Sequence, residues 1–414
     1  MQEKLQELLC YSFNNVEFYN ELYSQKGFDA NSLSQIDFKD IPIINKRMVV
    51  ENQEKIISQQ YNITDLQVDQ TSGTTGLILN VYWSKNDFIC SNKYLWSARK
   101  KYYSIGPFNK VVKFHTGAKY FDGKSYNPPR IIQNDRKLSL CKLFLDETQL
   151  KEYIYCINEF GPEWINSSPA IMNLFYIYMA NNSISFNKTI KYIEVSGEHL
   201  SPFYRERMDL FFGINMINQY GSRETNAIAI ECKNKYLHCL SNNFIEVVNE
   251  NFEVLDYNQE GYAIVSNLYN KAMPLIRYNL GDKIVLINGK TCTCGNEAPI
   301  IKLTACRISD YILTEDGRKI YCIIFINIIG MINYLNNNSI RQYKVVQNNY
   351  NQFTVNLSIK PNYNHNRIIS SFKKIAEEQL NINATWTFIF YDYIFPDNLT
   401  GKLKFFENKM LTVS

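Results

Sequence analysis

The sequence lacks several features that would assign it to a class at once. Its longest apolar run, residues 320–335, contains two asparagines and is shorter than the roughly 20 residues that a membrane span needs. We therefore expect a buried helix there and no membrane span. Residues 1–10 are polar and amphipathic, unlike a signal peptide. The net charge is only +4 and no basic stripe occurs, which argues against nucleic acid as a partner.

The ten cysteines also exclude a class, because they are scattered along 414 residues rather than spaced as a small disulfide framework. A cytoplasmic location is the expectation that follows. The sequence does not determine the oligomeric state.

What is present is the composition of an ordinary globular protein, with 45% hydrophobic and 20% charged residues. Its length exceeds one comfortable core, so two domains are expected. Strand-like runs alternate with helical segments, which indicates α/β architecture. The expected helices lie within the first 60 residues and at 162–181, 203–212 and 368–380; the expected strands lie at 65–70, 190–195, 214–217, 244–248, 262–266, 283–287, 344–346, 353–359 and 385–391.

A run of small residues follows the first expected strand. Glycine lets the backbone approach a ligand closely, and exposed N–H groups with hydroxyls can bind phosphate oxygens. The run is not a Walker A loop, because no Gly-Lys-Ser/Thr closes it. Alone, it fits an ordinary polar turn as well as a phosphate loop. Its members are Thr71, Ser72, Gly73, Thr74, Thr75 and Gly76.

Three later motifs carry further chemistry. Tyr220 beside Gly221 can stack on a flat base, and Glu224 can hold a divalent cation. Asp282, just after a glycine turn, can accept both hydroxyls of a ribose. Lys402 follows a glycine in a polar loop near the C-terminus. Each motif taken singly also fits a strand end, a turn or a solvated loop.

The order of these motifs resembles the adenylate-forming superfamily, and more closely its phenylacetate–CoA ligase and CapK-like branch. The resemblance covers nearly the whole chain and implies a large N-terminal α/β domain with several sheets, residues 1–309, and a small mobile α+β lid domain, residues 310–414. The motifs, in order, are Thr71–Gly76, Ser196–Glu198, Tyr220–Glu224, Arg277–Asp282, Arg307–Asp310 and Gly401-Lys402.

The resemblance also implies a role for each matching residue. Thr71 to Gly76 would wrap the β- and γ-phosphates of ATP, and Lys402 would be the lid lysine that acts during adenylation. The other nucleotide-binding residues would be Ser196, Gly197, Glu198, Tyr220, Gly221, Asp282 and Arg307; the catalytic residues would include Glu224, which would bind Mg²⁺, and Arg223; Asp310 would be the hinge; and Ser168, Pro169 and Ser222 would line the acid pocket.

The sequence departs from the family pattern at three positions. Leu77 follows the glycine-rich run where a lysine or proline is usual. Arg223 stands where a threonine or serine usually bonds the α-phosphate, and an arginine could serve there as a fixed cation. Cys306 replaces the glycine before Arg307.

The resemblance implies ATP-dependent activation of a small carboxylic acid, aromatic acids included, to an acyl-adenylate with release of pyrophosphate, then transfer to a thiol such as CoA. ATP, Mg²⁺ and CoA would be the cofactors. One alternative acceptor is a carrier protein or an amine in polysaccharide or natural-product biosynthesis. A different class of function is a catalytically silent, nucleotide-binding interaction protein, which Leu77 and Arg223 favour.

A structural zinc site is a separate hypothesis. Cys292 and Cys294 are two apart, and Cys232 with His238 precede them, so the four residues could bind Zn²⁺ tetrahedrally. Cys239 is the rival for the fourth ligand. The alternative interpretation is a set of buried or free thiols with a surface histidine.

Overall fold

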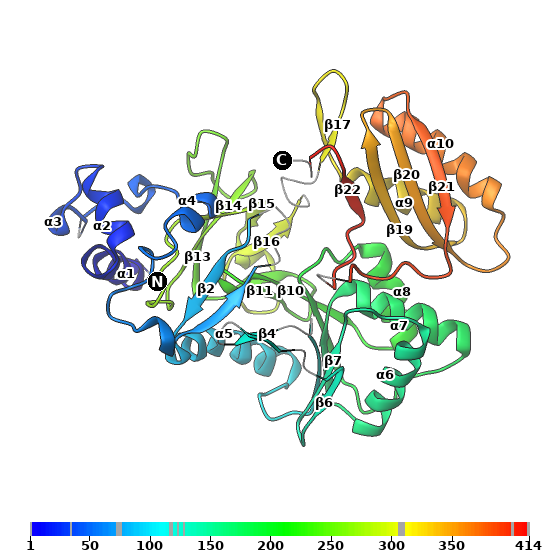
Figure 1. Ribbon diagram of the computed structural model, residues 1–414, viewed down its shortest axis with the longest axis horizontal. Helices are drawn as coiled ribbons and strands as arrows, with labels where there is room; N and C mark the ends of the chain where they lie inside the picture. The colour runs from blue at the N-terminus through cyan, green and yellow to red at the C-terminus, as the bar shows by residue number, and fades with distance from the viewer. Residues whose placement is uncertain are drawn as a thin grey trace. The chain divides into compact units, whose positions relative to one another are not determined.

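The computed structural model describes residues 2–33, 35–71, 77–115, 119–121, 124–126, 129–304, 311–398 and 401–411. It has a mixed α/β fold with a large central sheet and a small C-terminal sheet (Figure 1). Tertiary contacts divide it into two compact units, one of residues 1–107 with 218–307 and one of residues 108–217 with 308–414. The α/β class predicted from the sequence is confirmed.

The first unit begins with short helices and a hairpin, followed by one long helix. These elements are α1 (Gln2–Asn15), α2 (Glu17–Ser24), α3 (Ala30–Leu33), α4 (Lys46–Glu51), β1 (Gln67–Gln70), β2 (Asn80–Trp83) and α5 (Lys85–Tyr103). Local signals fix several ends: the Asn45 side chain caps α4, and the Ser84 hydroxyl caps α5 by accepting from the Asp87 N–H.

Seven strands of the central sheet belong to this unit, in the order β13-β14-β15-β16-β12-β11-β10, and these neighbours pair antiparallel. Their bounds are β10 (Met216–Ser222), β11 (Asn226–Glu231), β12 (Leu237–Cys239), β13 (Asn243–Val248), β14 (Glu260–Asn267), β15 (Tyr278–Ile287) and β16 (Ile300–Leu303). An apolar cluster that includes Tyr19, Trp83 and Ile276 packs the N-terminal helices against β2 and the start of β15.

A buried ion pair ties the N-terminal segment to this sheet. The Arg277 guanidinium and the Glu246 carboxylate are 3.0 Å apart, and their side chains are only 2% and 7% exposed. Arg277 also donates to the carbonyl oxygens of Ile41, at 2.6 Å, and of Lys39. Burial raises the pKa of Glu246, and the charge of Arg277 opposes that rise.

The second unit contains a mostly parallel part of the central sheet, with the strand order β9-β8-β3-β7-β6. Strand β3 pairs parallel with β7 and β8, and β8 with β9, whereas β6 and β7 are antiparallel. The elements are β3 (Val111–His115), β4 (Lys119–Phe121), β5 (Lys124–Tyr126), β6 (Ile131–Gln133), β7 (Lys137–Cys141), α6 (Glu147–Phe160), β8 (Trp164–Ser167), α7 (Pro169–Asn182), β9 (Tyr192–Ser196) and α8 (Pro202–Phe212).

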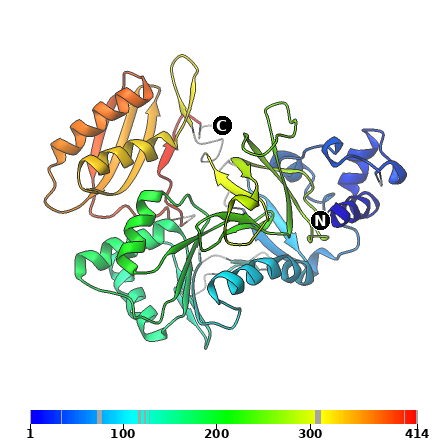
Figure 2. The same ribbon diagram turned by 180° about the vertical axis from the view of Figure 1, so that it is seen from behind.

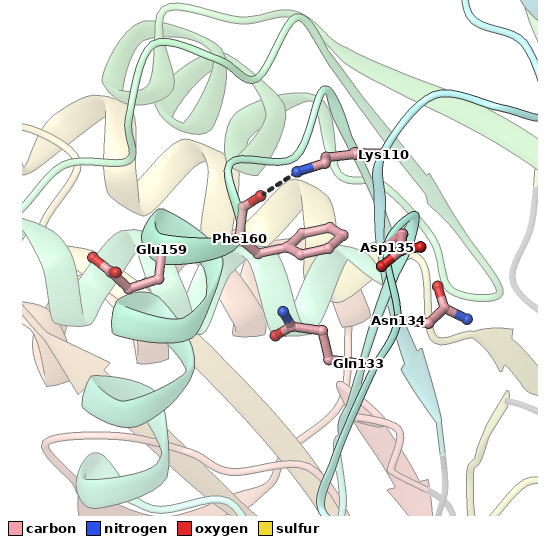
Figure 3. A pocket seen from close by; sticks show the side chains of 6 residues that line it. All are labelled: Lys110, Gln133, Asn134, Asp135, Glu159 and Phe160. Atoms are coloured by element: carbon pink, nitrogen blue, oxygen red, sulfur yellow. Dashed lines mark hydrogen bonds between the residues drawn. The ribbon is translucent and has the colours of Figure 1, made fainter.

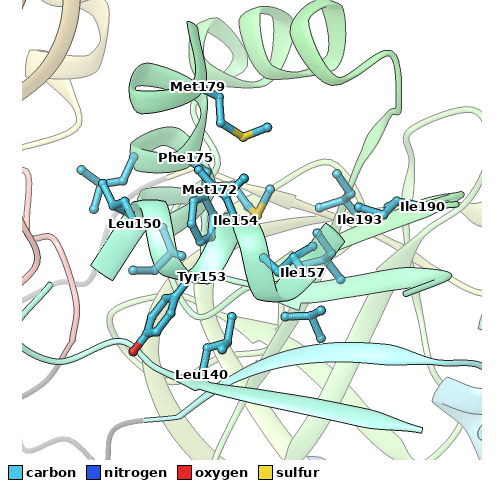
Figure 4. Close-up of a cluster of buried hydrophobic side chains, with 14 of the residues drawn as sticks. Leu140, Leu150, Tyr153, Ile154, Ile157, Met172, Phe175, Met179, Ile190 and Ile193 are labelled. Atoms are coloured by element: carbon cyan, nitrogen blue, oxygen red, sulfur yellow. The ribbon is translucent and has the colours of Figure 1, made fainter. Parts of the chain in front are cut away.

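Helices α6, α7 and α8 pack on these strands around one apolar core (Figure 4). Leu140 of β7, Ile154 of α6 and Phe175 of α7 meet there and are almost fully buried. Helix α6 begins with a capping box between Asp146 and Gln149, which satisfies N–H groups in its first turn. The parallel strands therefore end beside the starts of helices, where open α/β sheets place their ligands.

The C-terminal segment forms a small sheet with the strand order β21-β20-β19-β22. Figures 1 and 2 both show α9 and α10 side by side on one face of it. The elements are β17 (Tyr311–Leu313), β18 (Lys319–Tyr321), α9 (Ile324–Leu335), β19 (Ile340–Asn349), β20 (Gln352–Ile359), α10 (His365–Leu380), β21 (Thr385–Phe390) and β22 (Phe406–Asn408). Within this chain none of the described helices combines the length and hydropathy that crossing a membrane requires.

Arg207 of α8 attaches this small sheet to the rest of the second unit. Its guanidinium donates to the carbonyl oxygens of Ile340 and Arg341, each at 3.1 Å. It lies over the ring of Phe203 at 4.3 Å, and the Asn173 side chain donates a second hydrogen bond to the Arg341 carbonyl. The attachment thus uses carbonyl dipoles and an aromatic face rather than a carboxylate.

Most expected segments are confirmed, with the hairpin of β19 and β20 as the clearest case. Two expectations were wrong in their extent. The helix predicted for residues 162–181 begins only at Pro169, because Trp164–Ser167 form a strand. The Gly161-Pro162 pair predicts a helix start, but the actual start is at Pro169, which stands at the first helical position, where its missing N–H costs nothing. Similarly, the helix expected at 320–335 starts at Ile324, after β18.

We expect Arg277→Met to lower the free energy of unfolding by about 3–5 kcal/mol, because it leaves the Glu246 carboxylate buried without its cation. In the variant the folded-state pKa of Glu246 would lie still further above its unfolded value. The decrease in the free energy of unfolding should therefore be largest near pH 7 and become smaller as the pH falls, because protonation removes the unpaired buried charge. Urea denaturation at pH 7 and pH 5 measures both effects. Arg47→Met, which removes an exposed arginine, is the matched control; equal midpoints for the two variants would contradict the prediction.

Candidate functional site

The hairpin of β1 and β2 frames the glycine-rich run. The Thr71 N–H donates to the Leu79 carbonyl at 2.9 Å, and the Leu79 N–H donates to the Thr71 hydroxyl at 3.0 Å. The ammonium of Lys46, at the start of α4, also donates to that hydroxyl at 3.0 Å. Ser72, Gly73, Thr74, Thr75 and Gly76 lie outside the described residues. A cation therefore sits where the run begins.

The turn after β10 lies beside the same hairpin. Arg223 forms an ion pair with Asp69 of β1 at 2.8 Å, in which both side chains are about half exposed. The Glu224 carboxylate accepts from the Tyr278 hydroxyl at 3.4 Å. The Ser222 hydroxyl lies 3.0 Å from that of Thr225, inside the turn. Of the predicted catalytic residues in this turn, Arg223 therefore contacts β1 and Glu224 contacts β15.

Two predicted nucleotide-binding residues contact each other directly. The Tyr220 hydroxyl donates to the Asp282 carboxylate at 2.7 Å. Tyr220 is on β10 and Asp282 on β15, strands that are not neighbours, so this part of the sheet curls to bring them together. Gly281, with φ of +75°, turns the chain just before Asp282.

Gly221 is required by a close backbone approach. The register of β10 against β11 shifts between Tyr220 and Gly221. A Cβ atom on Gly221 would lie 2.5 Å from the Asn226 carbonyl oxygen, which is closer than such contacts occur. The bulge aims the Tyr220 ring and the following turn, as bulges beside functional sites do.

In the second unit, two predicted segments meet at the carboxyl ends of β8 and β9. Ser168 precedes α7 and Pro169 is its first residue; among the described residues the buried Ser168 hydroxyl has no hydrogen-bond partner. Ser196 ends β9, and Gly197 follows with φ of +81°. The Glu198 carboxylate accepts from the Ala170 N–H at 3.1 Å. The two segments are therefore bonded to each other.

The loop that carries Lys402 is closed by its own backbone. The Asp397 N–H donates to the Lys402 carbonyl at 2.9 Å, and the Gly401 N–H donates to the Asp397 carbonyl at 2.8 Å. The Leu403 N–H donates to the Glu198 carboxylate at 3.4 Å. Arg307 and the predicted hinge Asp310 lie outside the described residues.

A pocket of about 430 Å³ lies elsewhere in the second unit (Figure 3). Lys110 reaches over it and donates to the Phe160 carbonyl at 3.4 Å, while the turn between β6 and β7 forms the opposite side. The described residues that line it are Lys110, Gln133, Asn134, Asp135, Glu159 and Phe160, and none of these is a predicted site residue. We assign it no function.

The four predicted zinc ligands converge in the first unit. The ligand atoms of Cys232, His238, Cys292 and Cys294 all lie within 4.8 Å of one another. The Sγ atoms of Cys232 and Cys292 are 3.7 Å apart, and Cys294 Sγ is 3.3 Å from His238 Nε2. A tetrahedral zinc site separates two sulfurs by about 3.8 Å and sulfur from nitrogen by about 3.6 Å. Among the described residues, the cluster of ligand atoms does not include Cys239, the rival predicted for the fourth ligand.

The surroundings of this cluster suit a metal. His238 Nδ1 lies 3.0 Å from the Ala298 carbonyl, a contact that makes Nδ1 the donor and turns Nε2 toward the thiols. Burial opposes ionisation of Cys292, but its hydrogen-bonding contacts with His238 and the neighbouring cysteines outweigh this effect and lower its pKa to about 6. Burial raises the pKa of Cys232 to about 11. A bound cation would favour the thiolate at both positions.

Sequence reasoning missed Lys46, Asp69 and Tyr278, which contact predicted residues from distant parts of the chain. No local pattern marks them, because each is an ordinary residue type that becomes relevant only through the fold. The isolated bridge between Ile44 and Tyr278 is what brings the Lys46 segment to β15.

Comparisons with known proteins give consistent results. The chain matches no family model. It is 25% identical over 417 residues to the protein CapK of Staphylococcus aureus, covering 99% of this chain and 88% of that protein. It is 24% identical over 313 residues to the phenylacetate–coenzyme A ligase of Thermus thermophilus, covering 71% and 66%.

The fold agrees with solved structures as well. A 2-hydroxyisobutyryl-CoA ligase crystallised in its postadenylation state superposes with a TM-score of 0.77 at 15% identity, covering all of this chain and 91% of that one. An anthranilate CoA ligase superposes with a TM-score of 0.58 at 11% identity, over 84% of this chain and 67% of that one.

If the cysteine–histidine cluster holds zinc, the purified protein should contain about one zinc per chain, and Cys292→Ser should lose it together with several degrees of thermal stability. Elemental analysis and thermal denaturation measure the two quantities. Cys90→Ser, which changes a half-exposed thiol on α5, is the control and should retain the metal. Wild-type protein without zinc, whose stability a chelator leaves unchanged, would refute the site.

Proposed function

We propose a function for this chain as a member of the adenylate-forming ligase superfamily, with distant homology to CapK and phenylacetate–CoA ligase over most of its length. It activates a small carboxylic acid with ATP and transfers the acyl group to a thiol, most simply that of CoA. The direct contact between Tyr220 and Asp282 is the observation that carries this proposal. An aromatic ring and a ribose-binding carboxylate held together make half of an adenosine site.

The first unit supplies the groups that this site needs. The Tyr220 ring would stack on adenine, and Asp282 would accept from the ribose hydroxyls. The run that begins at Thr71 would wrap the outer phosphates; Ser196, Gly197 and Glu198 of the second unit stay predicted contacts of the base. Lys46 compensates for the missing lysine after the run, because its ammonium lies at Thr71. Arg307 stays a predicted ribose contact.

Glu224 and Arg223 would act on the phosphates. Glu224 offers a carboxylate oxygen for Mg²⁺, which supplies Lewis-acid stabilisation of phosphate charge when bound. Arg223 would hold the α-phosphate as a fixed cation. Its present partner Asp69 is exposed, so exchanging that ion pair for a phosphate contact costs little.

The reaction would proceed in two steps. The acid's carboxylate oxygen attacks the α-phosphorus, the bond to pyrophosphate breaks, and an acyl-adenylate forms. The ammonium of Lys402 stabilises the negative charge that develops. A thiolate then attacks the acyl carbonyl and AMP leaves. We propose that residues 310–414 act as the mobile lid with Asp310 as hinge, so that Lys402 serves only the first step.

The acid would be bound by Ser168, Pro169 and Ser222. The unpartnered Ser168 hydroxyl supports this assignment, since a buried hydroxyl without a hydrogen bond in the described structure is suited to bonding a ligand. The cysteine–histidine cluster would hold a structural zinc, because four protein ligands leave no open position. The cytoplasmic location stays a prediction.

The acceptor is a separate question, because the name of CapK, which matches 99% of this chain, specifies no acceptor, whereas the match to the CoA ligase covers 71% of it. The thiol of a carrier protein, or an amine, is therefore the alternative to CoA. A catalytically silent nucleotide-binding protein is the remaining alternative, which Leu77 and Arg223 support.

Acid-dependent exchange of pyrophosphate into ATP tests the proposed function. A panel of aryl and short acyl acids should contain at least one that drives exchange in the presence of Mg²⁺, and adding CoA should then convert that acid to its thioester. Exchange without thioester formation would favour the alternative acceptors. ATP binding by calorimetry without exchange on any acid would favour the silent protein, and absence of ATP binding would refute the proposal.

Lys402→Ala should lower the adenylation rate by about a hundredfold or more, because one charge that stabilises the transition state is lost. Thioester formation from supplied acyl-adenylate should survive the change. Lys404→Ala removes an exposed lysine two residues away and is the control. Normal exchange in Lys402→Ala would contradict the assignment of this lysine.

A further inference from the structure

Glu198 makes a contact that its predicted place beside the adenine does not explain. One carboxylate oxygen accepts the Ala170 N–H at 3.1 Å, and the other accepts the Leu403 N–H at 3.4 Å. Ala170 is the second residue of α7, and Leu403 directly follows Lys402. A single carboxylate therefore joins the start of a helix to the loop that carries the proposed lid lysine.

The helix end makes this place suitable for a negative charge. The first N–H groups of α7 have no partner within the helix, and the helix dipole places partial positive charge there. The side chains of Lys142 and Lys402 also attract the Glu198 carboxylate. Burial raises the pKa of Glu198 against these favourable interactions, so the group is held in a desolvated position by its partners.

Lys142 makes a second contact with the same loop. Gly401 has φ of +60°, and a Cβ atom placed on it would lie 2.7 Å from Lys142 Cε and 2.8 Å from Lys142 Cγ. The aliphatic part of Lys142 therefore occupies the space that any larger residue at position 401 would need. Lys142 directly follows β7 and is fixed by its N–H bond to the His115 carbonyl at 2.9 Å.

These observations concern one docking contact, which consists of Glu198, Ala170, Lys142, Gly401 and Leu403. We propose that Glu198 is a positioning residue that docks the Lys402 loop for the adenylation step, with Lys142 packing against Gly401 to complete the contact. This inference rests on the proposed function for the role of Lys402. The second step would require the Leu403 N–H to leave Glu198, so the contact favours the first half-reaction alone.

Hydrogen–deuterium exchange tests the contact without relying on activity. In Glu198→Gln one carboxylate oxygen becomes an NH₂ group, which cannot accept a hydrogen bond, and the negative charge is lost. We expect the remaining oxygen to stay with the Ala170 N–H, the shorter of the two bonds, so that the Leu403 N–H loses its acceptor. The peptide that contains Leu403 should exchange about tenfold faster than in the wild type, because a hydrogen bond to a charged acceptor is lost. Glu206→Gln, an exposed residue on α8, loses the same charge and should leave that peptide unchanged. Equal exchange in Glu198→Gln and wild type would overturn the proposal.

The two half-reactions test the role. Using the acid that gives the strongest exchange, Glu198→Gln should lower pyrophosphate exchange about tenfold more than it lowers thioester formation from supplied acyl-adenylate and CoA, because any loss at the adenine is common to both half-reactions. An equal loss in both half-reactions would refute the positioning role even where the peptide exchanges faster. Absence of pyrophosphate exchange in the wild type would instead refute the proposed function, and the hydrogen exchange result would still decide the contact.

A second pair of variants keeps the proposal testable if Glu198→Gln fails to fold. Gly401→Ala should speed hydrogen exchange at Leu403, because the added Cβ collides with Lys142. Adding Lys142→Ala should recover part of the protection by opening that space, while the positive φ at position 401 prevents full recovery. No recovery in the double variant would show that Lys142 does not hold the loop.

Discussion

The ion pair between Arg277 and Glu246 is the interaction on which the first unit's site depends. Arg277 precedes β15, and its guanidinium also holds the backbone at Lys39 and Ile41. Through that contact the segment leading to Lys46 lies against Tyr278, the residue whose hydroxyl reaches Glu224. One buried cation thus holds the segment that leads to Lys46 against β15, whose Tyr278 contacts the turn after β10.

Charge is arranged differently in the two units. In the first unit the proposed phosphate-binding cations Lys46 and Arg223 have polar partners that phosphate oxygens can replace. In the second unit the partly buried carboxylate of Glu198 accepts one hydrogen bond from an N–H at a helix start and one from an N–H of the Lys402 loop. Exchangeable partners suit ligand binding, whereas a carboxylate that bonds two backbone segments suits docking.

The sequence predicted those parts of the structure that depend on local pattern. Alternating apolar residues marked β19 and β20, and the ligand types and spacing around Cys292 predicted a cluster that the structure assembles within 4.8 Å. The order of motifs predicted that Tyr220 and Asp282 serve one site, and the two side chains are bonded.

The remainder depends on contacts between distant segments. Neither the partners of Arg277 nor the docking of Leu403 on Glu198 has any signature in the residues around them. The strand at Trp164–Ser167 was missed because its two apolar residues are followed by two polar ones rather than alternating with them, and because Pro162 just before it also fits a helix start.

Arg207 has a consequence for how the small C-terminal sheet responds to its medium. Its partners are the carbonyl oxygens of Ile340 and Arg341, both buried residues, and the partly buried ring of Phe203, and Arg207 itself is buried. Mobile ions screen exposed pairs of opposite charge, but they have little access to a guanidinium enclosed in this way. The junction is therefore insulated from changes in ionic strength, and solutes that weaken surface ion pairs should leave the small sheet attached.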